Sequence, residues 1–337
     1  MSAKPNPSPI NLKILLEGKT LERAPFPVPS GWFFVDYSES VKAGELRNVT
    51  IFDQEWVLFR TEGGKVGMSD PYCAHLGAHM GHGGKVCGEA LRCPFHHWEY
   101  NTEGWCTKVP YGTRTPPITK TQPIVRMLPI DERWGMIWAW YHPNCEPPAW
   151  QLPNVECLEQ PGYVPTRRGS WAANTMVQEI AENGVDFAHL KFLHGSPVIP
   201  PAEVKFEQHI FSVNMAGGYI EGKSYGPGLN LFNFNKDGAT AHMISYTQPI
   251  TRDRSQMNMS FTHKNYEDPK TLALAKHLVD HMIGSAANED SAGFEAVDFI
   301  IWNNKRYRHV PLLCDGDGPI IQFRNWFKQF YVEQAKF

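Results

Sequence analysis

Two short groups of cysteine and histidine stand in the first third of the chain. Cys73 and His75 are followed by Cys93 and His96, in the pattern C-x-H-x17-C-x2-H. Two thiolates and two imidazoles can hold a tetrahedral zinc ion, or a [2Fe–2S] cluster with two cysteines on one iron and two histidines on the other. Zinc fingers usually group like ligands together, whereas each group here offers one ligand of each kind. The spacing therefore favours the iron–sulfur cluster.

Further histidines and cysteines have no matching partner motif. His97 follows His96 directly, but the spacing selects His96 as the ligand, and the lone His79 and His82 are better explained by hydrogen bonding. An odd total of seven cysteines in a long chain argues against a disulfide framework. The remaining cysteines are expected to be small buried apolar side chains: Cys87, Cys106, Cys145, Cys157 and Cys314.

A second set of polar residues lies at Asn183, Asp186, His189 and His194. On a helix, Asp186 and His189 share a face because they are three residues apart. A helix that ends near Gly195 can bend His194 toward the same point. Two histidines and one carboxylate on one face of an octahedron form the site of non-haem Fe(II) oxygenases. The positions left open let O2 bind beside a substrate.

The carboxylate of such a site must come from another part of the chain, and we choose Asp298. It stands in the apolar helical segment 294–302, where an unpaired carboxylate would be costly to bury. A role as metal ligand would remove that cost. An exposed acid on the helix surface is the competing interpretation, and Glu295 and Asp290 are the alternative ligands.

The elements that would position these residues divide into two domains, as the length of 337 residues suggests. Residues 1–28 are rich in proline and polar residues, and we expect an arm with one short helix around 12–16. Residues 29–145 contain short β-branched and aromatic runs separated by turn residues, which predicts a small all-β domain. The two cysteine–histidine groups would lie on its loops.

Residues 146–337 are expected to form an α+β domain, with helices packed on an antiparallel sheet. Its expected elements are a linker at 141–165, a strand at 170–180, a helix near 181–193, alternating strands over 203–262, and helices from Asp268 and over about 287–304. Large side chains of the strand region could line an apolar cavity: Phe206, Phe211, Met215, Tyr219, Leu229, Leu231, Phe232, Phe234, Met243 and Tyr246.

Composition excludes several classes of function. The formal net charge of −3 gives no reason to expect nucleic acid or an anionic membrane as a partner. No stretch approaches the roughly 18 uncharged apolar residues of a membrane-spanning helix. The first residues also lack the apolar run of a secretory signal. We therefore expect a cytoplasmic protein without a membrane span.

Around the two cysteine–histidine groups, the chain resembles the terminal oxygenase component of the Rieske non-haem iron oxygenases. The similarity extends over PYCAHLGAHMGHGGKV and LRCPFHHWEYNTEG. It implies one [2Fe–2S] cluster, with Cys73 and Cys93 on one iron and His75 and His96 on the other. Alanine follows Cys73 where many relatives have proline, and His97 stands where many have glycine, but neither change removes a ligand.

The same resemblance implies a helix-grip (START-like) catalytic domain with one mononuclear Fe(II). The ligands would be His189, His194 and Asp298, because related oxygenases place an aspartate four residues before the tryptophan of this helix. The Asp186 carboxylate would link His189 to His96 of a neighbouring subunit by accepting a hydrogen bond from each imidazole. This path implies a head-to-tail homotrimer.

Among these oxygenases, the chain resembles the subgroup of 3-ketosteroid 9α-hydroxylase oxygenases and sterol 7-desaturases. The similarity runs through ENGVDFAHLKFLHGSPV, where Asn183 would join Asp186 as a catalytic residue, and through the more discriminating PLLCDGDGPIIQFRNWFKQFY. It implies hydroxylation of a C–H bond of a steroid-like apolar polycycle with O2 and two electrons. No G-x-G-x-x-G motif opens a βα unit, so NADH would act only through a separate ferredoxin or flavin reductase.

Other functions stay open at this point. A sterol desaturase or demethylase would use the same iron chemistry and differ only in its product. A Rieske electron carrier would need only one domain and would leave residues 183–194 unexplained. A sterol-binding module would lack the mononuclear iron and its Asp298 ligand.

Overall fold

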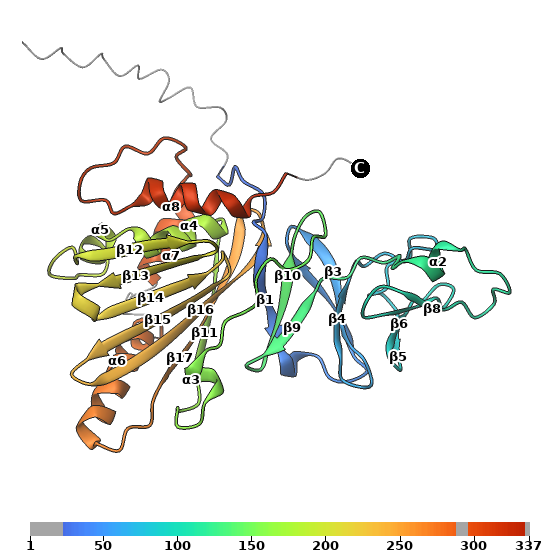
Figure 1. The fold of residues 1–337 in the computed structure, drawn as a ribbon, viewed down its shortest axis with the longest axis horizontal. Helices are drawn as coiled ribbons and strands as arrows, with labels where there is room; N and C mark the ends of the chain where they lie inside the picture. Colours follow the sequence, from blue (N-terminus) through green and yellow to red (C-terminus); the bar gives the residue numbers. More distant parts are fainter. Residues whose placement is uncertain (1–22, 288–295, 334–337) are drawn as a thin grey trace, which may run out of the picture.

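The computed structural model describes residues 23–287 and 296–333. They form an elongated molecule, with a β-rich domain at one end and a larger α+β domain at the other (Figure 1). The predicted fold class is therefore confirmed. The predicted helix at 12–16 and the alternative ligands Asp290 and Glu295 lie outside the described residues.

The β-rich domain consists of three small antiparallel sheets. The first has the order β1-β10-β9 and contains β1 (Gly31–Tyr37), β10 (Met136–Tyr141) and β9 (Ile130–Arg133). The second contains β2 (Leu46–Ile51), β3 (Gln54–Arg60) and β4 (Val66–Ser69), and the third contains β5 (Lys85–Cys87), β6 (Ala90–Arg92), β7 (Glu99–Asn101) and β8 (Cys106–Lys108). The short helices η1 (Ser38–Ser40) and α2 (Ile118–Thr121) connect strands.

Strand β10 reads MIWAWY and is buried along its whole length, because it packs on both of its faces. Trp138 and Trp140 point into a core that they share with Ile244 and Tyr246 of the second domain. Ile137, one residue along, belongs to a different core, which contains Leu58 of the first domain and extends to Phe211 of the second. This alternation joins the two domains through one strand.

The second domain is built on a seven-stranded antiparallel sheet of order β11-β17-β16-β15-β14-β13-β12. Its strands are β11 (Arg167–Ala173), β12 (Ala202–Glu207), β13 (Ile210–Met215), β14 (Ile220–Tyr225), β15 (Leu229–Lys236), β16 (Ala239–Thr251) and β17 (Arg254–His263). The helices are α3 (Glu156–Glu159), α4 (Val177–Glu182), η2 (Asn183–Val185), α5 (Ala188–Phe192), η3 (Ala216–Gly218), α6 (Pro269–Ala287), α7 (Ala296–Asn304), α8 (Ile320–Phe327) and η4 (Lys328–Phe330).

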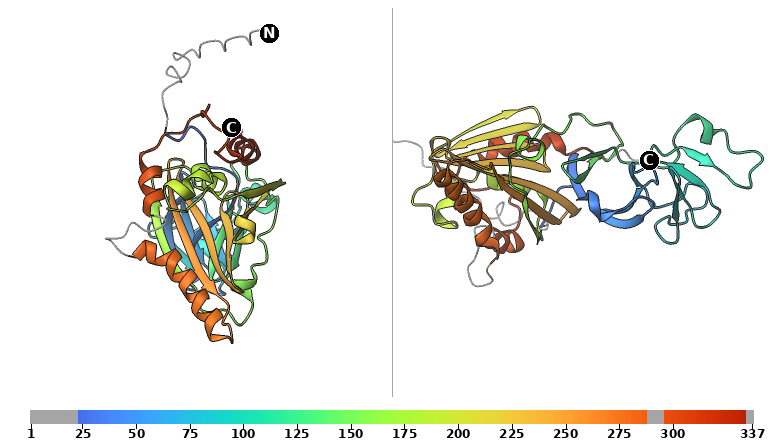
Figure 2. Two further views of the ribbon diagram at one scale, coloured as in Figure 1. Left: turned by 90° about the vertical axis from the view of Figure 1, so that its left-hand side faces the viewer. Right: turned by 90° about the horizontal axis from the view of Figure 1, so that it is seen from below.

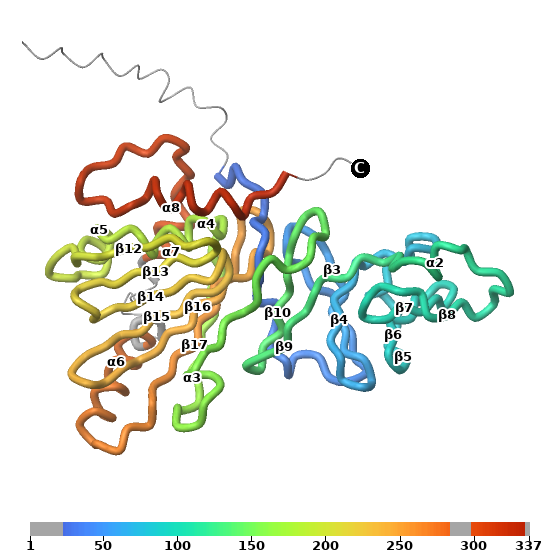
Figure 3. The backbone as a smooth tube through the Cα atoms, in the orientation of Figure 1, coloured from blue at the N-terminus to red at the C-terminus, as the bar shows by residue number. Residues whose placement is uncertain are grey.

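Helices cover one face of this sheet (Figure 2). Leu278 and Val279 of α6 and Phe299 of α7 share a core with Met259 and Phe261 of β17. The C-terminal helix α8 lies beside α4 (Figure 3), and the apolar face of α8 packs against α4. The helices and the sheet leave a cavity between them.

The predicted continuous helix near 181–193 is wrong. Helix α4 passes into the tighter η2, the backbone becomes extended at Asp186 (φ −89°, ψ 93°), and α5 then begins at Ala188. Asp186 therefore does not share a helical face with His189. Its Oδ1 instead accepts a hydrogen bond from the His189 backbone N–H at 3.4 Å, a contact that aspartate commonly makes just before a helix.

Candidate functional site

Two loops at the far end of the first domain bring the cysteine–histidine groups together. The Cys73 N–H bonds to Ala78 O (2.9 Å), and the Cys93 N–H bonds to Trp98 O (2.8 Å), so each loop is closed by its own backbone. Both thiols are buried. The rings of His75 and His96 meet edge to face, with their centroids 4.8 Å apart.

The arrangement of this group favours one of the two kinds of centre that the sequence allows. Each of the two loops offers one thiol and one imidazole at the same end of the domain. The two imidazole rings lie against each other, as two ligands of one iron would in a [2Fe–2S] cluster with two cysteines on the other iron.

Neighbouring side chains fix the cluster loops. The Tyr100 hydroxyl lies 3.1 Å from Cys73 Sγ, and burial together with this cysteine raises the pKa of Tyr100. The His75 ring stacks on Trp98, with centroids 4.6 Å apart. His97 is exposed and has a φ of 60°. That left-handed backbone favours glycine. The His96 ring, not that of His97, lies against His75.

The second candidate centre joins three elements of the α+β domain. His189 on α5, His194 just beyond it and Asp298 on α7 have ligand atoms that all lie within 4.8 Å of one another. His194 Nε2 is 3.1 Å from Asp298 Oδ2, and their side chains are only 2% and 9% exposed. The structure thus buries Asp298 rather than exposing it on the helix surface. Two imidazoles and a carboxylate of this compactness fit one Fe(II).

Asn183 connects two members of this triad. Its amide Nδ2 lies 3.2 Å from Asp298 Oδ1 and 3.4 Å from His189 Nε2. The residue belongs to η2, which directly follows the fully buried helix α4. Because α4 is held in the core, the amide is held against the carboxylate and the imidazole.

Asp186 lies on the outer side of the triad and is not part of it. Its Oδ1 is 3.9 Å from His189 Nδ1, and its side chain is 39% exposed. Burial alone would raise the pKa of Asp186, but the hydrogen bond and charge of His189 outweigh burial and lower it. Asp186 is therefore an ionised group that can hold His189 from outside.

A cavity of about 120 Å³ opens beside the triad, between the helices and the sheet. Its lining includes the flexible side chains of Met215, Met243, Met257 and Met259, which can adapt to the shape of a ligand. The other lining residues are Ile180, Ala181, Asn183, Gly184, Phe187, His189, Leu190, His194, Phe211, Ile220, Asn230, Phe232, Phe234, Ser245, Asp298 and Trp302. A hollow of about 680 Å³ on the opposite face of the sheet is more polar and contains none of the triad.

Half of the side chains predicted to line the cavity do so, and the strand period explains three of the five that do not. Phe232 and Phe234 face the cavity. Leu229 and Leu231 lie on the other face of the same strand, because successive residues alternate. The predictions that are wrong in this respect are Phe206, Tyr219, Leu229, Leu231 and Tyr246. The lining residues Asn230 and Ser245 were not predicted.

Comparison with known families decides the class of this protein. Residues 31–123 match the Rieske [2Fe–2S] domain, and residues 139–331, more than half of the chain, match the 3-ketosteroid 9alpha-hydroxylase C-terminal domain. The chain belongs to this family. It is a Rieske-type non-haem iron monooxygenase, with a [2Fe–2S] cluster and a mononuclear iron as its cofactors.

Relatives of this Rieske oxygenase fall in both branches of the predicted subgroup. The cholesterol 7-desaturase of Xenopus laevis is 28% identical, over 91% of this chain and 72% of the relative. The oxygenase component of the 3-ketosteroid-9-alpha-monooxygenase of Rhodococcus rhodochrous is 27% identical, over 90% of this chain and 83% of the relative. The predicted family and subgroup are confirmed.

Solved structures show the same fold. NdmA of Pseudomonas putida CBB5 aligns with a TM-score of 0.67 at 18% identity, over 88% of each chain. Dicamba monooxygenase bound to dicamba aligns with a TM-score of 0.65 at 17% identity, over 91% of this chain and 98% of the other. Of the helices in the described part of this Rieske oxygenase, none has the length and hydropathy needed to cross a membrane.

Proposed function

We propose that this oxygenase hydroxylates a C–H bond of a steroid-like apolar polycyclic substrate, with O2 and two electrons from a separate reductase. The observation that carries the proposal is an apolar, methionine-rich cavity that ends on the triad of His189, His194 and Asp298. The relative from Rhodococcus rhodochrous is named for action on a 3-ketosteroid and as an oxygenase component, which supports both the substrate class and the separate reductase.

We assign the ligands accordingly. Cys73, Cys93, His75 and His96 would hold the cluster, and His189, His194 and Asp298 would hold the mononuclear iron, which supplies the activation of O2 when it is bound. The remaining contributions come from the protein itself. The Asn183 amide would fix the orientation of the Asp298 carboxylate, and the apolar lining would exclude water from the reacting carbon.

Electron transfer would cross between subunits of a homotrimer. The loops that carry Cys73 and Cys93 lie at one end of the elongated molecule. Helix α5, which carries His189, lies at the opposite end (Figure 1). Asp186 would join His189 to His96 of a neighbouring subunit. Exposed apolar side chains at the two ends support such a contact: Leu76 and Phe95 beside the cluster loops, and Phe192 on α5.

Desaturation is the second candidate reaction. It is favoured by the cholesterol 7-desaturase of Xenopus laevis, which matches this chain with nearly the same identity and coverage as the monooxygenase component. The two reactions would use the same ligands and differ in whether oxygen is added to the substrate or only hydrogen is removed.

A turnover experiment tests the proposal. The iron-loaded protein would be supplied with NADH, a surrogate reductase, isotopically labelled O2 and androst-4-ene-3,17-dione. A product that carries one labelled oxygen supports hydroxylation, and an unlabelled product with an additional double bond supports desaturation. Substituting His189→Ala should abolish turnover and leave the cluster spectrum intact, whereas retained turnover would overturn the assignment of the iron site.

A further inference from the structure

Four of the eleven methionines of the chain line the cavity beside the triad. Met215 lies on β13, Met243 on β16, and Met257 and Met259 on β17. Met257 and Met259 are two residues apart on one strand, so both side chains point to the same face of the sheet. The wall that the sheet contributes to the cavity therefore presents thioethers from three strands.

These thioethers lie close to the candidate iron ligands. Met257 and Met259 share a core with Trp302, which follows Asp298 by one turn on α7. Trp302, Asp298 and His189 line the same cavity as the methionines. A reactive species formed at the triad would therefore meet sulfur in the opposite wall.

The same sulfur atoms are shielded from the solvent. Met215, Met257 and Met259 are only 5%, 9% and 2% exposed. An oxidant dissolved in the solvent would have to enter the cavity to reach them, whereas an oxidant produced at the triad is already inside. Oxidation of these buried side chains would therefore report chemistry at the triad.

A thioether accepts one oxygen atom and becomes a sulfoxide. The reaction is a monooxygenation with sulfur in place of carbon. One O2, two electrons and two protons convert one methionine into one methionine sulfoxide and one water: the O–O bond breaks, an S–O bond forms, and the second oxygen atom leaves as water. The electrons come from the reductase that already supplies them for substrate oxidation, and no C–H bond has to be broken.

We propose that Met215, Met243, Met257 and Met259 are sites of self-oxidation, to which the enzyme transfers oxygen when it activates O2 without a substrate in the cavity. This inference rests on the proposed function, because it takes the triad to activate O2 beside this cavity. A sulfoxide is polar where the thioether was apolar, so the oxidised cavity binds an apolar substrate less well. Self-oxidation thus switches off an enzyme that consumes O2 without its substrate, and a methionine sulfoxide reductase can reverse it.

Peptide mass spectrometry after reaction with isotopically labelled O2 tests the inference on the full, iron-loaded chain. The protein would be incubated with NADH, a surrogate reductase and catalase, once without steroid and once with androst-4-ene-3,17-dione. Catalase removes peroxide that escapes into the solution. Met282 is the matched internal control, because it is 6% exposed and shares the core of Met257 but does not line the cavity.

We expect labelled sulfoxide on at least one of the four cavity methionines in the reaction without steroid, and little on Met282. The variant His189→Ala should lose this label. Equal label on Met282, or label retained in His189→Ala, would overturn the inference, because a diffusing oxidant would then be responsible.

The reaction with steroid separates failure of this inference from failure of the proposed function. An oxidised steroid product, without label on the cavity methionines in the steroid-free reaction, would overturn the inference alone. Absence of both label and steroid product would overturn the proposed function together with it. Label without any steroid product would support self-oxidation and contradict the steroid-like substrate class.

A leucine variant tests the consequence for binding. Leucine is close to methionine in volume and apolar, so the combined variant Met215→Leu, Met243→Leu, Met257→Leu and Met259→Leu keeps the cavity wall but carries no sulfur. After the steroid-free reaction, wild type should bind androst-4-ene-3,17-dione about 5- to 100-fold more weakly than before, the effect of an unpaired polar group in an apolar wall. The variant should keep its affinity, as equilibrium dialysis would measure. Equal losses in the two proteins, or no loss in oxidised wild type, would refute the switch, and the labelling result on wild type does not depend on this variant.

Discussion

The amide Nδ2 of Asn183 lies 3.2 Å from Oδ1 of Asp298, a residue that is 115 positions further along the chain. Through this contact, the segment that leads to His189 is joined to the helix that carries the carboxylate. The same amide lies 3.4 Å from His189 Nε2. One side chain thus links two of the three candidate iron ligands.

Replacing this amide should weaken the iron site without affecting the cluster. Asn183→Leu keeps much of the side-chain volume but removes the bond to Asp298. Loss of such an orienting partner typically costs 10- to 100-fold in metal affinity or activity. We expect a loss of about that size in Fe(II) affinity, measured by iron titration, with an unchanged cluster spectrum. Wild-type iron affinity in the variant would contradict the orienting role.

The buried ion pair of Arg324 and Glu182 should be required for the stability of the catalytic domain. Two hydrogen bonds of 2.7 and 2.8 Å join the guanidinium of α8 to the carboxylate at the end of α4. Both side chains are about nine-tenths buried. Arg324→Met leaves the Glu182 charge without its partner, so we expect a loss of about 3–5 kcal/mol in the free energy of unfolding, measured by urea denaturation.

Two further variants separate the charge effect from general damage. The double variant Arg324→Met with Glu182→Leu leaves no buried charge and should recover a large part of the loss. Arg306→Met changes an exposed arginine and should alter the free energy of unfolding by less than about 0.5 kcal/mol. If Arg324→Met were no more destabilising than Arg306→Met, the importance of the pair would be refuted.

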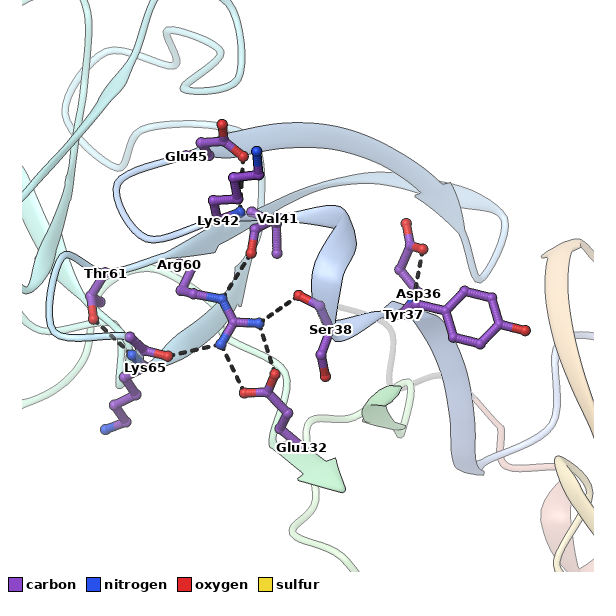
Figure 4. Close-up of polar contacts among 11 residues, drawn as sticks. Asp36, Tyr37, Ser38, Val41, Lys42, Glu45, Arg60, Thr61, Lys65 and Glu132 are labelled. Atoms are coloured by element: carbon purple, nitrogen blue, oxygen red, sulfur yellow. Dashed lines mark hydrogen bonds and ion pairs between the residues drawn. The ribbon is translucent and has the colours of Figure 1, made fainter. Parts of the chain in front are cut away.

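Arg60 connects strands of the first domain and binds the carboxylate of Glu132 (Figure 4). We predict that this pair makes the stability of the domain depend on pH. All five N–H groups of Arg60 are used: two bond to Glu132 at 2.7 and 2.9 Å, and three bond to the carbonyls of Ser38, Val41 and Gly64. The hydrogen bonds from Arg60 hold the pKa of Glu132 below its usual range.

Because the folded-state pKa is lowered, the ionised Glu132 stabilises the domain above the pKa of an unfolded glutamate, about 4.3. This contribution is lost as the pH falls through the lower folded-state value. Glu132→Gln should therefore be less stable than wild type by about 1–2 kcal/mol at pH 7, with a difference that shrinks below about pH 4.3. Unfolding followed by the cluster absorbance would measure it. Glu39→Gln, at an exposed ion pair with Arg168, should have little effect at either pH.

The hydroxyl of Tyr100 should raise the reduction potential of the cluster. It lies 3.1 Å from Cys73 Sγ, and a hydrogen bond to a cluster sulfur stabilises the more negative, reduced state. Tyr100→Phe should therefore lower the potential by about 20–60 mV, the equivalent of one neutral hydrogen bond for a one-electron couple. Redox titration would measure the shift. Tyr141→Phe, a buried tyrosine of the first domain, is the control, and equal potentials in the two variants would contradict the prediction.

The part of the site that could be predicted best consists of residues that lie close together in the sequence. Cys73 with His75 and Cys93 with His96 lie on two short loops, so the sequence interval already determines most of their geometry. Asp298 was chosen because a carboxylate in an apolar helix requires a partner, and the structure places it beside His194. Its role as a ligand stays a prediction.

Features that depend on register or on tertiary packing were harder to predict. The helix expected through Asp186 is interrupted, because the backbone becomes extended there and α5 begins only afterwards. Asn230 looks like an outward-facing residue of an alternating strand when it is read alone. Only the pairing of β15 with β16 brings it beside Ser245 and turns both toward the cavity.

The most direct test of the two proposed centres is the content of iron and acid-labile sulfide in the wild-type chain and in His189→Ala. We predict about three irons and two sulfides per chain in the wild type. The variant should lose about one iron and no sulfide, and keep the spectrum of the reduced cluster. Zinc without sulfide in the wild type, or loss of sulfide in His189→Ala, would contradict a cluster and a separate mononuclear iron held by these residues.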